Sequence, residues 1–333
     1  MPGDSEKPAR PGEFDLIDRY FKPLATSLPG AFGLTDDAAT ICPADGNEFV
    51  VTTDTIVETV HYLGGETPGN VAAKLMRVNL SDLAAKGAVP AAYSLNLALS
   101  AKIDDAWLLA FSAGLAAEQE EFGIGLLGGD TVSTTGPLVL TITAMGEVAR
   151  GTALHRFGAN PGDRLFVTGT IGDGALGLLA ATYKLADLDQ AENDYLRNRY
   201  ERPDPRVTVG PKLIGLATAA MDVSDGLIAD CTHMAVASGL AATIDTITVP
   251  LSDAAATAIA MDPDLLETAL TGGDDYEILF AAPESRRGQI AELAAETGVP
   301  ITEIGSLVKG SGVVARDADG NAVSFAKPGY LHG

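Results

Sequence analysis

Cysteines and long hydrophobic runs are scarce in this chain. Its 333 residues include two cysteines, Cys42 and Cys231, which lie far apart and form no CxxC pair. The sequence therefore predicts two reduced thiols rather than a disulfide framework. No run approaches the roughly 20 apolar residues that cross a bilayer. The opening MPGDSEKPARPGEF also lacks the apolar segment of a signal peptide. We therefore expect a cytoplasmic protein without a membrane partner.

Basic residues are also few. The chain has 22 lysines and arginines against 45 aspartates and glutamates, and its net charge is -23. This balance argues against nucleic acid or an anionic membrane as a partner, because both are negatively charged. A phosphate ligand would also be repelled unless metal cations came between. The other interpretation is a generally acidic, solvated surface, since acidity alone specifies no ligand.

Common nucleotide-binding motifs are missing or out of context. The chain has no GxxxxGK[ST] motif and no protein-kinase catalytic loop. Gly123, Gly125 and Gly128 match GxGxxG, but a predicted helix precedes them where a dinucleotide-binding fingerprint needs a strand. The turn GTIGDG, residues 169–174, could offer backbone N–H groups to a phosphate. We favour a tight structural turn there.

Strands alternate with helices along the whole chain, which predicts an α/β or α+β class in each half. We expect two domains, residues 1–150 and 151–333, because Gly, Asn and Pro cluster near 151–163. The hydrophobic pattern predicts helices over residues 14–26, 70–86, 104–122, 175–185 and 227–238. It predicts strands over residues 38–42, 49–53, 93–99, 124–127, 138–148, 164–168, 242–247 and 276–281.

Aspartates recur where predicted strands end or predicted helices begin. These rims collect functional side chains because a rigid scaffold positions them. Each aspartate could instead cap a helix or bond its own turn. The recurring residues are Asp36, Asp37, Asp54, Asp82, Asp130, Asp222, Asp225, Asp274 and Asp275.

Asp82 is the hardest of these to explain by local structure. Asn79, Asp82 and Lys86 lie on one stripe of an otherwise apolar helix. Each polar group buried there without a partner would cost about 1–3 kcal/mol, or more for a charge. A metal site lined by this face would provide partners.

The histidines give no competing metal signal. His61, His155, His233 and His332 show no metal-ligand spacing. Carboxylates without histidine or cysteine favour a hard cation, so Mg²⁺ fits better than Zn²⁺. Several acidic turns would suit several Mg²⁺ ions and a polyphosphate.

The motifs together resemble the thiamine-monophosphate kinase family, within the wider aminoimidazole-ribonucleotide-synthetase-like superfamily. The resemblance covers residues 14–331. It implies a two-domain α/β fold that forms a homodimer through its N-terminal sheet, and phosphorylation of thiamine monophosphate by ATP to give thiamine diphosphate. The matching segments are DTIVETVHY, KLMRVNLSDLAAKGAVP, GGDT, ALHRFGANPGD, RPDPR, DVSDGL and GGDDYEILF.

The resemblance also implies roles for individual residues. The implied Mg²⁺ ligands are Asp37, Thr52, Thr53, Asp54, Asp82, Asp130, Asp222 and Asp225. The implied ATP contacts are Gly129, Asp130, Arg156 and Ser224. The implied contacts to thiamine monophosphate are His61, Asp274 and Tyr330.

Four departures from the family pattern affect these roles. Leu34 and Thr35 replace the usual Ile-Gly before the double aspartate, and Lys86 stands where Met is common. The loop after GGDT, residues 132–135, is altered. The C-terminus reads GYLHG and lacks the family's final Phe, which weakens the Tyr330 assignment.

In the implied reaction the nucleophile is a phosphate oxygen. A phosphomonoester has its second pKa near about 6, so it is largely deprotonated at pH 7 and needs no general base. We expect direct in-line transfer, with Mg²⁺ and Arg156 offsetting the repulsion between the two phosphates.

Three alternatives remain. Selenophosphate synthetase or a purine-pathway cyclo-ligase is the closest, although the former carries a reactive Cys or selenocysteine near its N-terminus and this chain has none before Cys42. A hydrogenase-type maturation factor carries a C-terminal cysteine tail, which is absent. A non-enzymatic acidic cation-binding protein has no need for GGDT, Arg156 and DVSDGL together.

Overall fold

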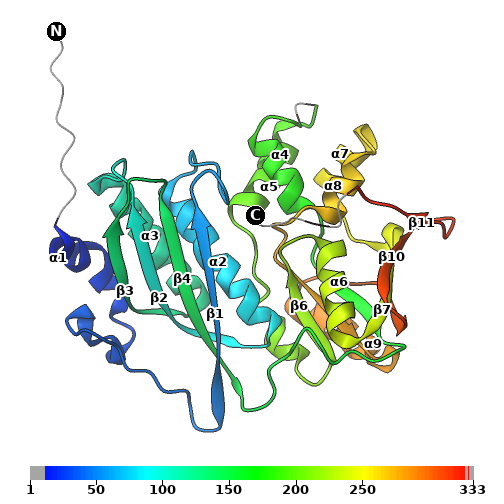
Figure 1. Ribbon diagram of the computed structural model, residues 1–333, viewed down its shortest axis with the longest axis horizontal. Coiled ribbons are helices and arrows are strands. Elements are labelled where there is room, and N and C mark those ends of the chain that lie inside the picture. Colours follow the sequence, from blue (N-terminus) through cyan, green and yellow to red (C-terminus); the bar gives the residue numbers. More distant parts are fainter. Residues whose placement is uncertain (1–11, 186, 327–328, 330–333) are drawn as a thin grey trace. The chain divides into compact units, whose positions relative to one another are not determined.

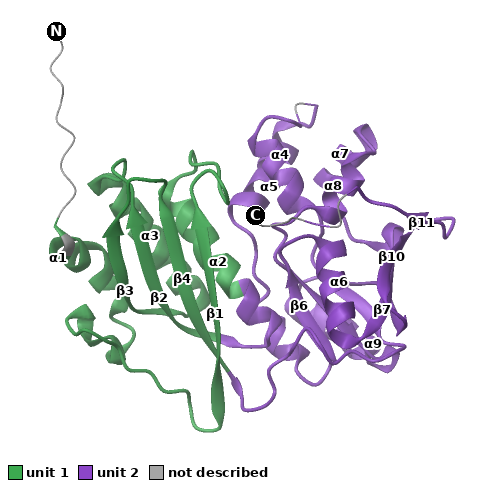
Figure 2. Ribbon diagram, viewed as in Figure 1, with its two compact units in different colours: residues 1–80, 90–147 green, residues 81–89, 148–333 purple. Residues whose placement is uncertain are grey.

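The computed structural model describes residues 12–185, 187–326 and 329. The chain forms two compact units, shown in Figure 2. Unit 1 comprises residues 1–80 and 90–147, and unit 2 comprises residues 81–89 and 148–333. The unit boundary at residues 80 and 81 falls inside helix α2 (Pro68–Ala85), so the last turn of that helix belongs to unit 2.

Unit 1 contains a four-stranded sheet in the order β1-β4-β2-β3 (Figure 1). Its strands are β1 (Asn47–Val57), β2 (Val89–Leu99), β3 (Gly125–Ser133) and β4 (Val139–Ala149). Helices α2 and α3 (Asp105–Phe122) lie on one side of the sheet. The two helices approach closely at Gly114, where an added Cβ would lie 2.8 Å from the Gly69 Cα. Gly114 therefore has no room for a side chain.

Helix α3 begins and ends at local signals. The Asp104 side chain accepts a hydrogen bond from the Trp107 N–H at 2.9 Å, as an N-cap does. Gly123 ends the helix in the left-handed conformation, with φ 66°. The predicted helix over residues 104–122 is therefore confirmed.

The start of unit 1 is less regular than predicted. The expected helix over residues 14–26 is helical but changes type, through α1 (Glu13–Leu16), the π-helix η1 (Ile17–Phe21) and the 3₁₀ helix η2 (Lys22–Ala25). A 3₁₀ segment, η3 (Pro29–Leu34), follows. The predicted strand over residues 38–42 is wrong: the segment pairs with no strand, and the Thr40 N–H donates to the Gly30 carbonyl at 2.9 Å.

Unit 2 contains a seven-stranded sheet in the order β11-β10-β7-β9-β5-β8-β6. Its described pairings are antiparallel except for the parallel pair β10 and β7. The strands are β5 (Arg164–Thr168), β6 (Ala219–Val223), β7 (Leu240–Asp245), β8 (Glu277–Ala282), β9 (Ile301–Lys309), β10 (Gly312–Arg316) and β11 (Ala322–Val323). The helices are α4 (Asp173–Ala181), α5 (Gln190–Glu201), α6 (Leu227–Ser238), α7 (Asp253–Met261), α8 (Leu265–Thr271) and α9 (Arg287–Thr297), with 3₁₀ segments η4 (Gly210–Leu213), η5 (Thr246–Thr248) and η6 (Glu284–Arg286).

Strands β5, β6 and β8 of the unit 2 sheet are buried on both faces. Along β5, Leu165 and Val167 belong to the hydrophobic cluster that includes Leu227 of α6. Phe166, between them, belongs to the cluster that includes Ile290 of α9. Successive side chains of a strand point to opposite faces, so alternate residues fill two separate cores. This explains why β5, β6 and β8 consist mostly of apolar residues.

The remaining expectations differ mainly at element ends. The helix predicted over 175–185 is α4, which begins earlier, at Asp173, and ends at Ala181. The strand predicted over 242–247 is β7, which ends at Asp245 because a 3₁₀ turn follows. No helix among the described residues is long and apolar enough to cross a membrane.

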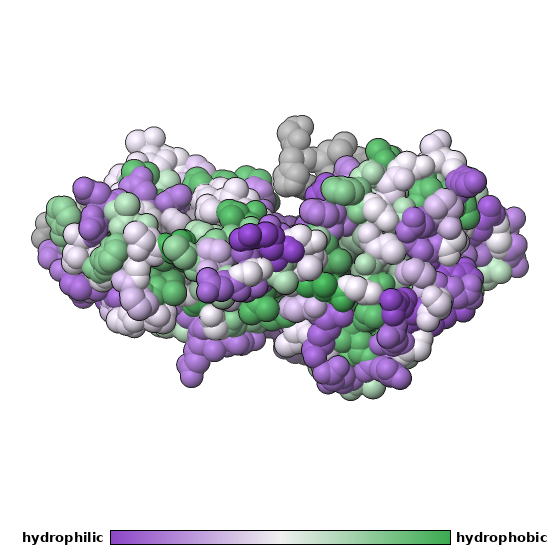
Figure 3. All heavy atoms as spheres, turned by 90° about the horizontal axis from the view of Figure 1, so that it is seen from below, coloured by the Kyte–Doolittle hydropathy of each residue, from purple (hydrophilic) through white to green (hydrophobic). Residues whose placement is uncertain are grey.

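Both cysteines are free. Cys42 is exposed, whereas Cys231 is buried in α6 and burial raises the pKa of its thiol to about 12. On the face shown in Figure 3, hydrophilic residues are spread over both units, with hydrophobic residues between them in small groups.

Unit 1 also contains a buried ion pair between helices α2 and α3, and replacing one partner would test how far this pair stabilises the unit. Arg77 of α2 donates to Glu118 of α3 at 2.7 Å, and both side chains are less than a tenth exposed. Replacing Glu118 by Ala would leave the buried guanidinium with Glu121 as its remaining acidic contact. We expect Glu118→Ala to lower the free energy of unfolding by about 3 kcal/mol in urea titrations.

The matched control is the exposed pair between Lys22 and Asp18. Asp18→Ala should change the free energy of unfolding by less than about 0.5 kcal/mol. Equal effects of the two substitutions would contradict a packing role for the buried pair.

Candidate active site

The predicted site residues are divided between the two units. Tyr330 lies outside the described residues. Unit 1 holds Asp37, Thr52, Thr53, Asp54, His61, Gly129 and Asp130. Unit 2 holds Asp82, Arg156, Asp222, Ser224, Asp225 and Asp274.

In unit 1, strand β1 presents its three candidate ligands on two faces. Thr52 and Asp54 share one face of the strand, and Thr53 lies on the other, because side chains alternate along a strand. The Thr53 hydroxyl donates to the Ile142 carbonyl of β4 at 3.0 Å. If Thr52 and Asp54 hold an ion, Thr53 could therefore contribute to it only through its main-chain atoms, not through its side chain.

Asp54 is tied to helix α2 by Asn79. The Asp54 N–H donates to Asn79 Oδ1 at 3.1 Å, and Asn79 Nδ2 donates to the Leu75 carbonyl at 2.9 Å. Asn79 is fully buried. The Asn79 side-chain amide, which makes both of these hydrogen bonds, therefore fixes this part of β1 against the helix.

His61 lies shortly after β1. Its Nδ1 accepts a hydrogen bond from the Val57 N–H at 3.1 Å. The ring is thereby oriented by the main chain of the strand, with Nδ1 as the acceptor.

A cavity of about 540 Å³ in unit 1 brings together Asp37, Gly129 and Asp130. Gly129 is required by close packing, since an added Cβ would lie 1.7 Å from the Leu95 carbonyl oxygen of β2. The expectation that Asp130 follows the end of a strand is wrong, because β3 continues to Ser133. The side chain of Asp130 is therefore positioned by a strand rather than by a turn.

In unit 2, carboxylates crowd together at the end of β6. Asp222 is 8% exposed, and its Oδ2 accepts a hydrogen bond from the Ser81 hydroxyl at 2.9 Å. Burial, and then the charges of Asp82 and Asp230, raise the pKa of Asp222 well above its usual value. Like charges in a buried place oppose ionisation, and a divalent cation among them would reverse that effect.

Lys86 offsets part of this negative charge, since its positive charge opposes the rise in the pKa of Asp222. Its Nζ donates to the Ala220 carbonyl at 3.0 Å. Burial lowers the pKa of Lys86, while the charges of Asp222 and Asp82 oppose the lowering. The departure from the family pattern at this position therefore places a cation against the main chain of β6.

The expectation that the polar stripe of α2 needs partners is confirmed for two of its three members. Asn79 and Lys86 find theirs in main-chain groups of β1 and β6 rather than in a metal. Asp82 is the member whose charge faces Asp222.

The DVSDGL turn, which joins β6 to α6, is held by a residue that the sequence did not single out. Asp230 Oδ2 accepts hydrogen bonds from the N–H groups of Ser224 and Asp225, at 3.1 and 3.0 Å. Asp230 is buried, and burial raises its pKa to about 7. From the sequence alone it reads as an ordinary acidic residue in the first turn of a helix.

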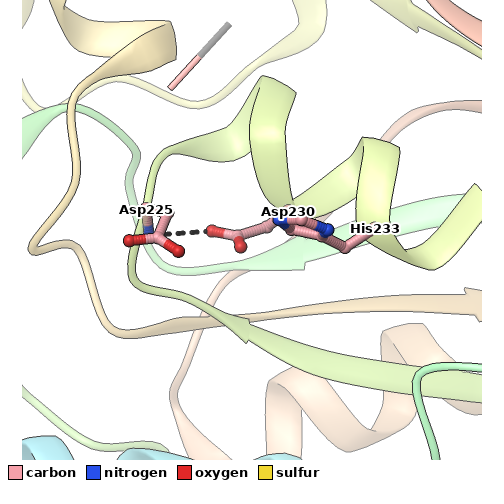
Figure 4. A group of neighbouring side chains, drawn as sticks. All are labelled: Asp225, Asp230 and His233. Carbon is pink, nitrogen blue, oxygen red and sulfur yellow. Dashed lines mark hydrogen bonds between the residues drawn. The ribbon is translucent and has the colours of Figure 1, made fainter. Parts of the chain in front are cut away.

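Figure 4 shows Asp230 between Asp225 and His233. One possible ligand atom from each of these three residues lies within 4.8 Å of the other two. Asp225 is half-buried and His233 is exposed, so the group opens to solvent on one side. The dashed line marks the hydrogen bond from the Asp225 main chain to the Asp230 carboxylate.

Arg156 lies on the segment between β4 and β5, and its side chain is exposed. The neighbouring His155 carbonyl accepts a hydrogen bond from the Ala220 N–H of β6 at 2.7 Å. The positive charge of Arg156 opposes the rise that burial causes in the pKa of Asp230. Arg156 is therefore held near the carboxylates of unit 2.

The GTIGDG turn is filled by the protein's own carboxylate. Asp275 accepts hydrogen bonds from the N–H groups of Gly172 and Gly174, at 2.8 and 2.9 Å. The N–H groups of Gly169 and Ile171 donate to the carbonyls of Pro300 and Pro250. The interpretation as a structural turn is confirmed, since these donors are already used.

Asp274 lies beside the DVSDGL turn. Its N–H donates to the Ser224 carbonyl at 3.0 Å, and its Oδ1 accepts from the Tyr276 hydroxyl at 3.0 Å. The structure thus brings Asp82, Asp222, Ser224, Asp225, Asp274 and Arg156 into one region of unit 2.

The chain is similar to known proteins over almost its whole length. Residues 35–148 match the family model "AIR synthase related protein, N-terminal domain", and residues 160–318 match "AIR synthase related protein, C-terminal domain". A thiamine-monophosphate kinase of Caulobacter vibrioides is 44% identical over 328 residues, which cover 98% of this chain and 92% of that protein.

Solved structures are similar over nearly the whole chain. Thiamine-monophosphate kinase from Stenotrophomonas maltophilia has a TM-score of 0.83 and 41% identity, covering 94% of this chain and 98% of that one. AaThiL complexed with AMPPCP and TMP has a TM-score of 0.75 and 31% identity, covering 94% of each chain. The hydrogenase maturation protein HypE in complex with ATP shares the fold at 20% identity. The expected two-domain α/β fold is confirmed.

The crowding of carboxylates in unit 2 predicts a gain of stability when one charge is removed. With a metal chelator present, Asp222→Asn should raise the free energy of unfolding by about 1 kcal/mol. The Asn side chain can still accept the hydrogen bond from the Ser81 hydroxyl, but it does not repel the Asp82 carboxylate. A melting temperature higher by about 2–4 °C would be expected in a thermal scan.

Asp163→Asn is the matched control. Asp163 is also buried, but its carboxylate accepts from the Asn160 N–H and the Thr218 hydroxyl. We expect this variant to melt at the wild-type temperature or below it. A lower melting temperature for Asp222→Asn would instead make that carboxylate a structural one.

Proposed function

The chain belongs to the thiamine-monophosphate kinase family, and on this premise we propose that it transfers the γ-phosphoryl group of ATP to thiamine monophosphate, giving thiamine diphosphate. The observation that carries this activity is full-length similarity to curated kinases of this kind. It is joined by similarity to a solved relative complexed with AMPPCP and TMP. A maturation-factor function is less well supported, because HypE is similar only at the level of the fold.

Mg²⁺ suits the donors that the chain offers. The carboxylates crowded at Asp222 are hard oxygen ligands. The pKa of Asp222 is raised, and a bound divalent cation would reverse that shift. When bound, Mg²⁺ ions would neutralise the charge of the phosphate groups. The residues that we propose to hold them are Asp37, Thr52, Asp54 and Asp130, with Thr53 through its main chain, in unit 1, and Asp82, Asp222 and Asp225 in unit 2.

The other site residues would bind and orient the two substrates. We propose that Gly129, Asp130, Arg156 and Ser224 contact ATP, and that His61, Asp274 and Tyr330 contact thiamine monophosphate. Residues 1–150 would contribute metal and nucleotide ligands, and residues 151–333 would contribute ATP and substrate contacts. We further propose that the enzyme is a cytoplasmic homodimer.

The chemistry requires alignment more than acid–base catalysis. The acceptor phosphate has a second pKa near about 6, so it is mostly a dianion at pH 7 and needs no base to activate it. Arg156 would stabilise the charge of the transferring group. Ser224, whose main-chain N–H donates to the Asp230 carboxylate, would hold the nucleotide. Transfer would then occur in a single in-line displacement.

The activity is tested by incubating the protein with Mg-ATP and thiamine monophosphate and measuring thiamine diphosphate by chromatography. We expect product from the wild type. Asp82→Asn and Asp130→Asn should each lower kcat by about 100-fold or more, because each removes charge that the reaction uses. The melting temperature of Asp130→Asn should change little, and that of Asp82→Asn should not fall, because its substitution removes a charge that repels Asp222.

Asp319→Asn is the control, since Asp319 is exposed in the turn between β10 and β11. It should retain wild-type turnover. Hydrolysis of ATP on some other acceptor, without thiamine diphosphate, would contradict the proposed activity. Normal turnover with lowered melting temperature would make Asp82 and Asp130 structural.

The single displacement has a stereochemical consequence. With ATP made chiral at the γ-phosphorus by oxygen isotopes, one displacement inverts the configuration and two displacements retain it. We expect inversion in the product, analysed by phosphorus NMR. Retention would indicate a phosphoenzyme intermediate and would rule out direct transfer.

A further inference from the structure

The loop between α8 and β8, residues 272–276, has a strained backbone. Asp274 and Tyr276 have φ values of 72° and 54°. L-residues other than glycine seldom adopt such values, because the Cβ crowds the following carbonyl, and an aromatic residue does so less readily than Asp. A conformation of this kind persists only where its surroundings impose it, and it is common at functional sites.

Asp275, between the two strained residues, fixes one side of the loop. Its carboxylate is 1% exposed, with Oδ2 on the Gly172 N–H and Oδ1 on the Gly174 N–H. The contact is close, since a Cβ on Gly174 would lie 2.3 Å from the Asp274 carbonyl carbon. The loop therefore cannot move away from the 169–174 turn without leaving two buried N–H groups without an acceptor.

The DVSDGL turn fixes the other side. The N–H groups of Asp274 and Tyr276 donate to the carbonyls of Ser224 and Val223, at 3.0 and 2.8 Å. A Cβ on Gly273 would lie 2.2 Å from the Ser224 carbonyl oxygen. Hydrogen bonds and close packing on both sides thus hold the strained conformation.

The strain has a consequence for one side chain. With both residues in the left-handed region, the Tyr276 hydroxyl reaches back to Asp274 Oδ1 at 3.0 Å. The phenol donates one directional hydrogen bond to the carboxylate and thereby restricts its rotation. Both side chains are partly exposed, so a ligand can reach this carboxylate.

We propose that Asp275 and Tyr276 are positioning residues for Asp274. Asp275 sets the main chain of the loop, and Tyr276 sets the orientation of the Asp274 carboxylate before substrate arrives. The carboxylate would then bind the cationic, amino-bearing organic part of thiamine monophosphate without reordering. This inference rests on the proposed function and adds the two residues that make its substrate contact rigid.

Steady-state kinetics with each substrate varied in turn test the proposal. Tyr276→Phe removes one hydroxyl and keeps the ring. Asp275→Asn replaces one acceptor oxygen by an amide that cannot accept from glycine N–H. We expect the KM for thiamine monophosphate to rise about 10-fold in Tyr276→Phe and further in Asp275→Asn, while the KM for ATP stays within about twofold of the wild type.

Matched controls separate positioning from general stability. Tyr195→Phe removes another Tyr–Asp hydrogen bond, the 3.0 Å contact to Asp173. Asp163→Asn alters another buried carboxylate that accepts from the main chain. Both should keep the wild-type KM for thiamine monophosphate, even where the melting temperature falls.

The outcomes are distinct. Wild-type turnover in the same assay reports on the proposed function alone, and its absence overturns both proposals. With that turnover present, an unchanged KM for thiamine monophosphate in Tyr276→Phe overturns the inference, whether or not Asp275→Asn folds. An equal rise in both KM values would also overturn it, because that result indicates general damage to the site.

Discussion

Two buried carboxylates, each accepting two main-chain N–H groups, hold the candidate site of unit 2 together. Asp230 binds the turn after β6, and Asp275 binds the turn before α4. Tight turns leave N–H groups that no helix or strand can satisfy, and burying them unpaired is costly. An anion inside the protein satisfies these groups, and it does so without occupying the face that a ligand would use. The positions of Asp225 and of the loop that carries Asp274 depend on these two.

The consequence is a division of roles between neighbouring aspartates. Asp275 is buried and bonded to the main chain, whereas Asp274, next to it, is partly exposed. In the DVSDGL segment, Asp225 is partly exposed and Asp230 is buried below it. The supporting member of each pair accepts the backbone N–H groups of the turns, so the other member is not needed for that task. A rigid supporting shell of this kind is what binding and catalysis require.

The same arrangement explains why an acidic protein can suit anionic substrates. Asp222 is buried with Asp82 and Asp230 as like-charged neighbours, and Lys86 is directed to a main-chain carbonyl instead. The cluster is therefore unfavourable by itself and favourable once cations enter, which is a common cost of functional sites. Under the proposed function, the negative charge of the site would bind metal ions, and these would in turn bind phosphate.

Much of this protein could be predicted from its sequence, because the signals are local. The Asp104 cap and Gly123 delimit α3, alternating apolar residues mark the strands, and the order of the aspartate motifs indicates the family. Local signals failed where distant contacts decide: residues 38–42 find no strand to pair with, and Asp130 lies inside β3. They also could not assign the supporting carboxylates, since Asp275 and Gly172 are separated by 103 residues. The sequence by itself determined many of the elements, the acidic chemistry and the family. Only the tertiary structure decided which aspartates face a ligand and which satisfy the backbone, because that depends on which turns folding brings within hydrogen-bond distance.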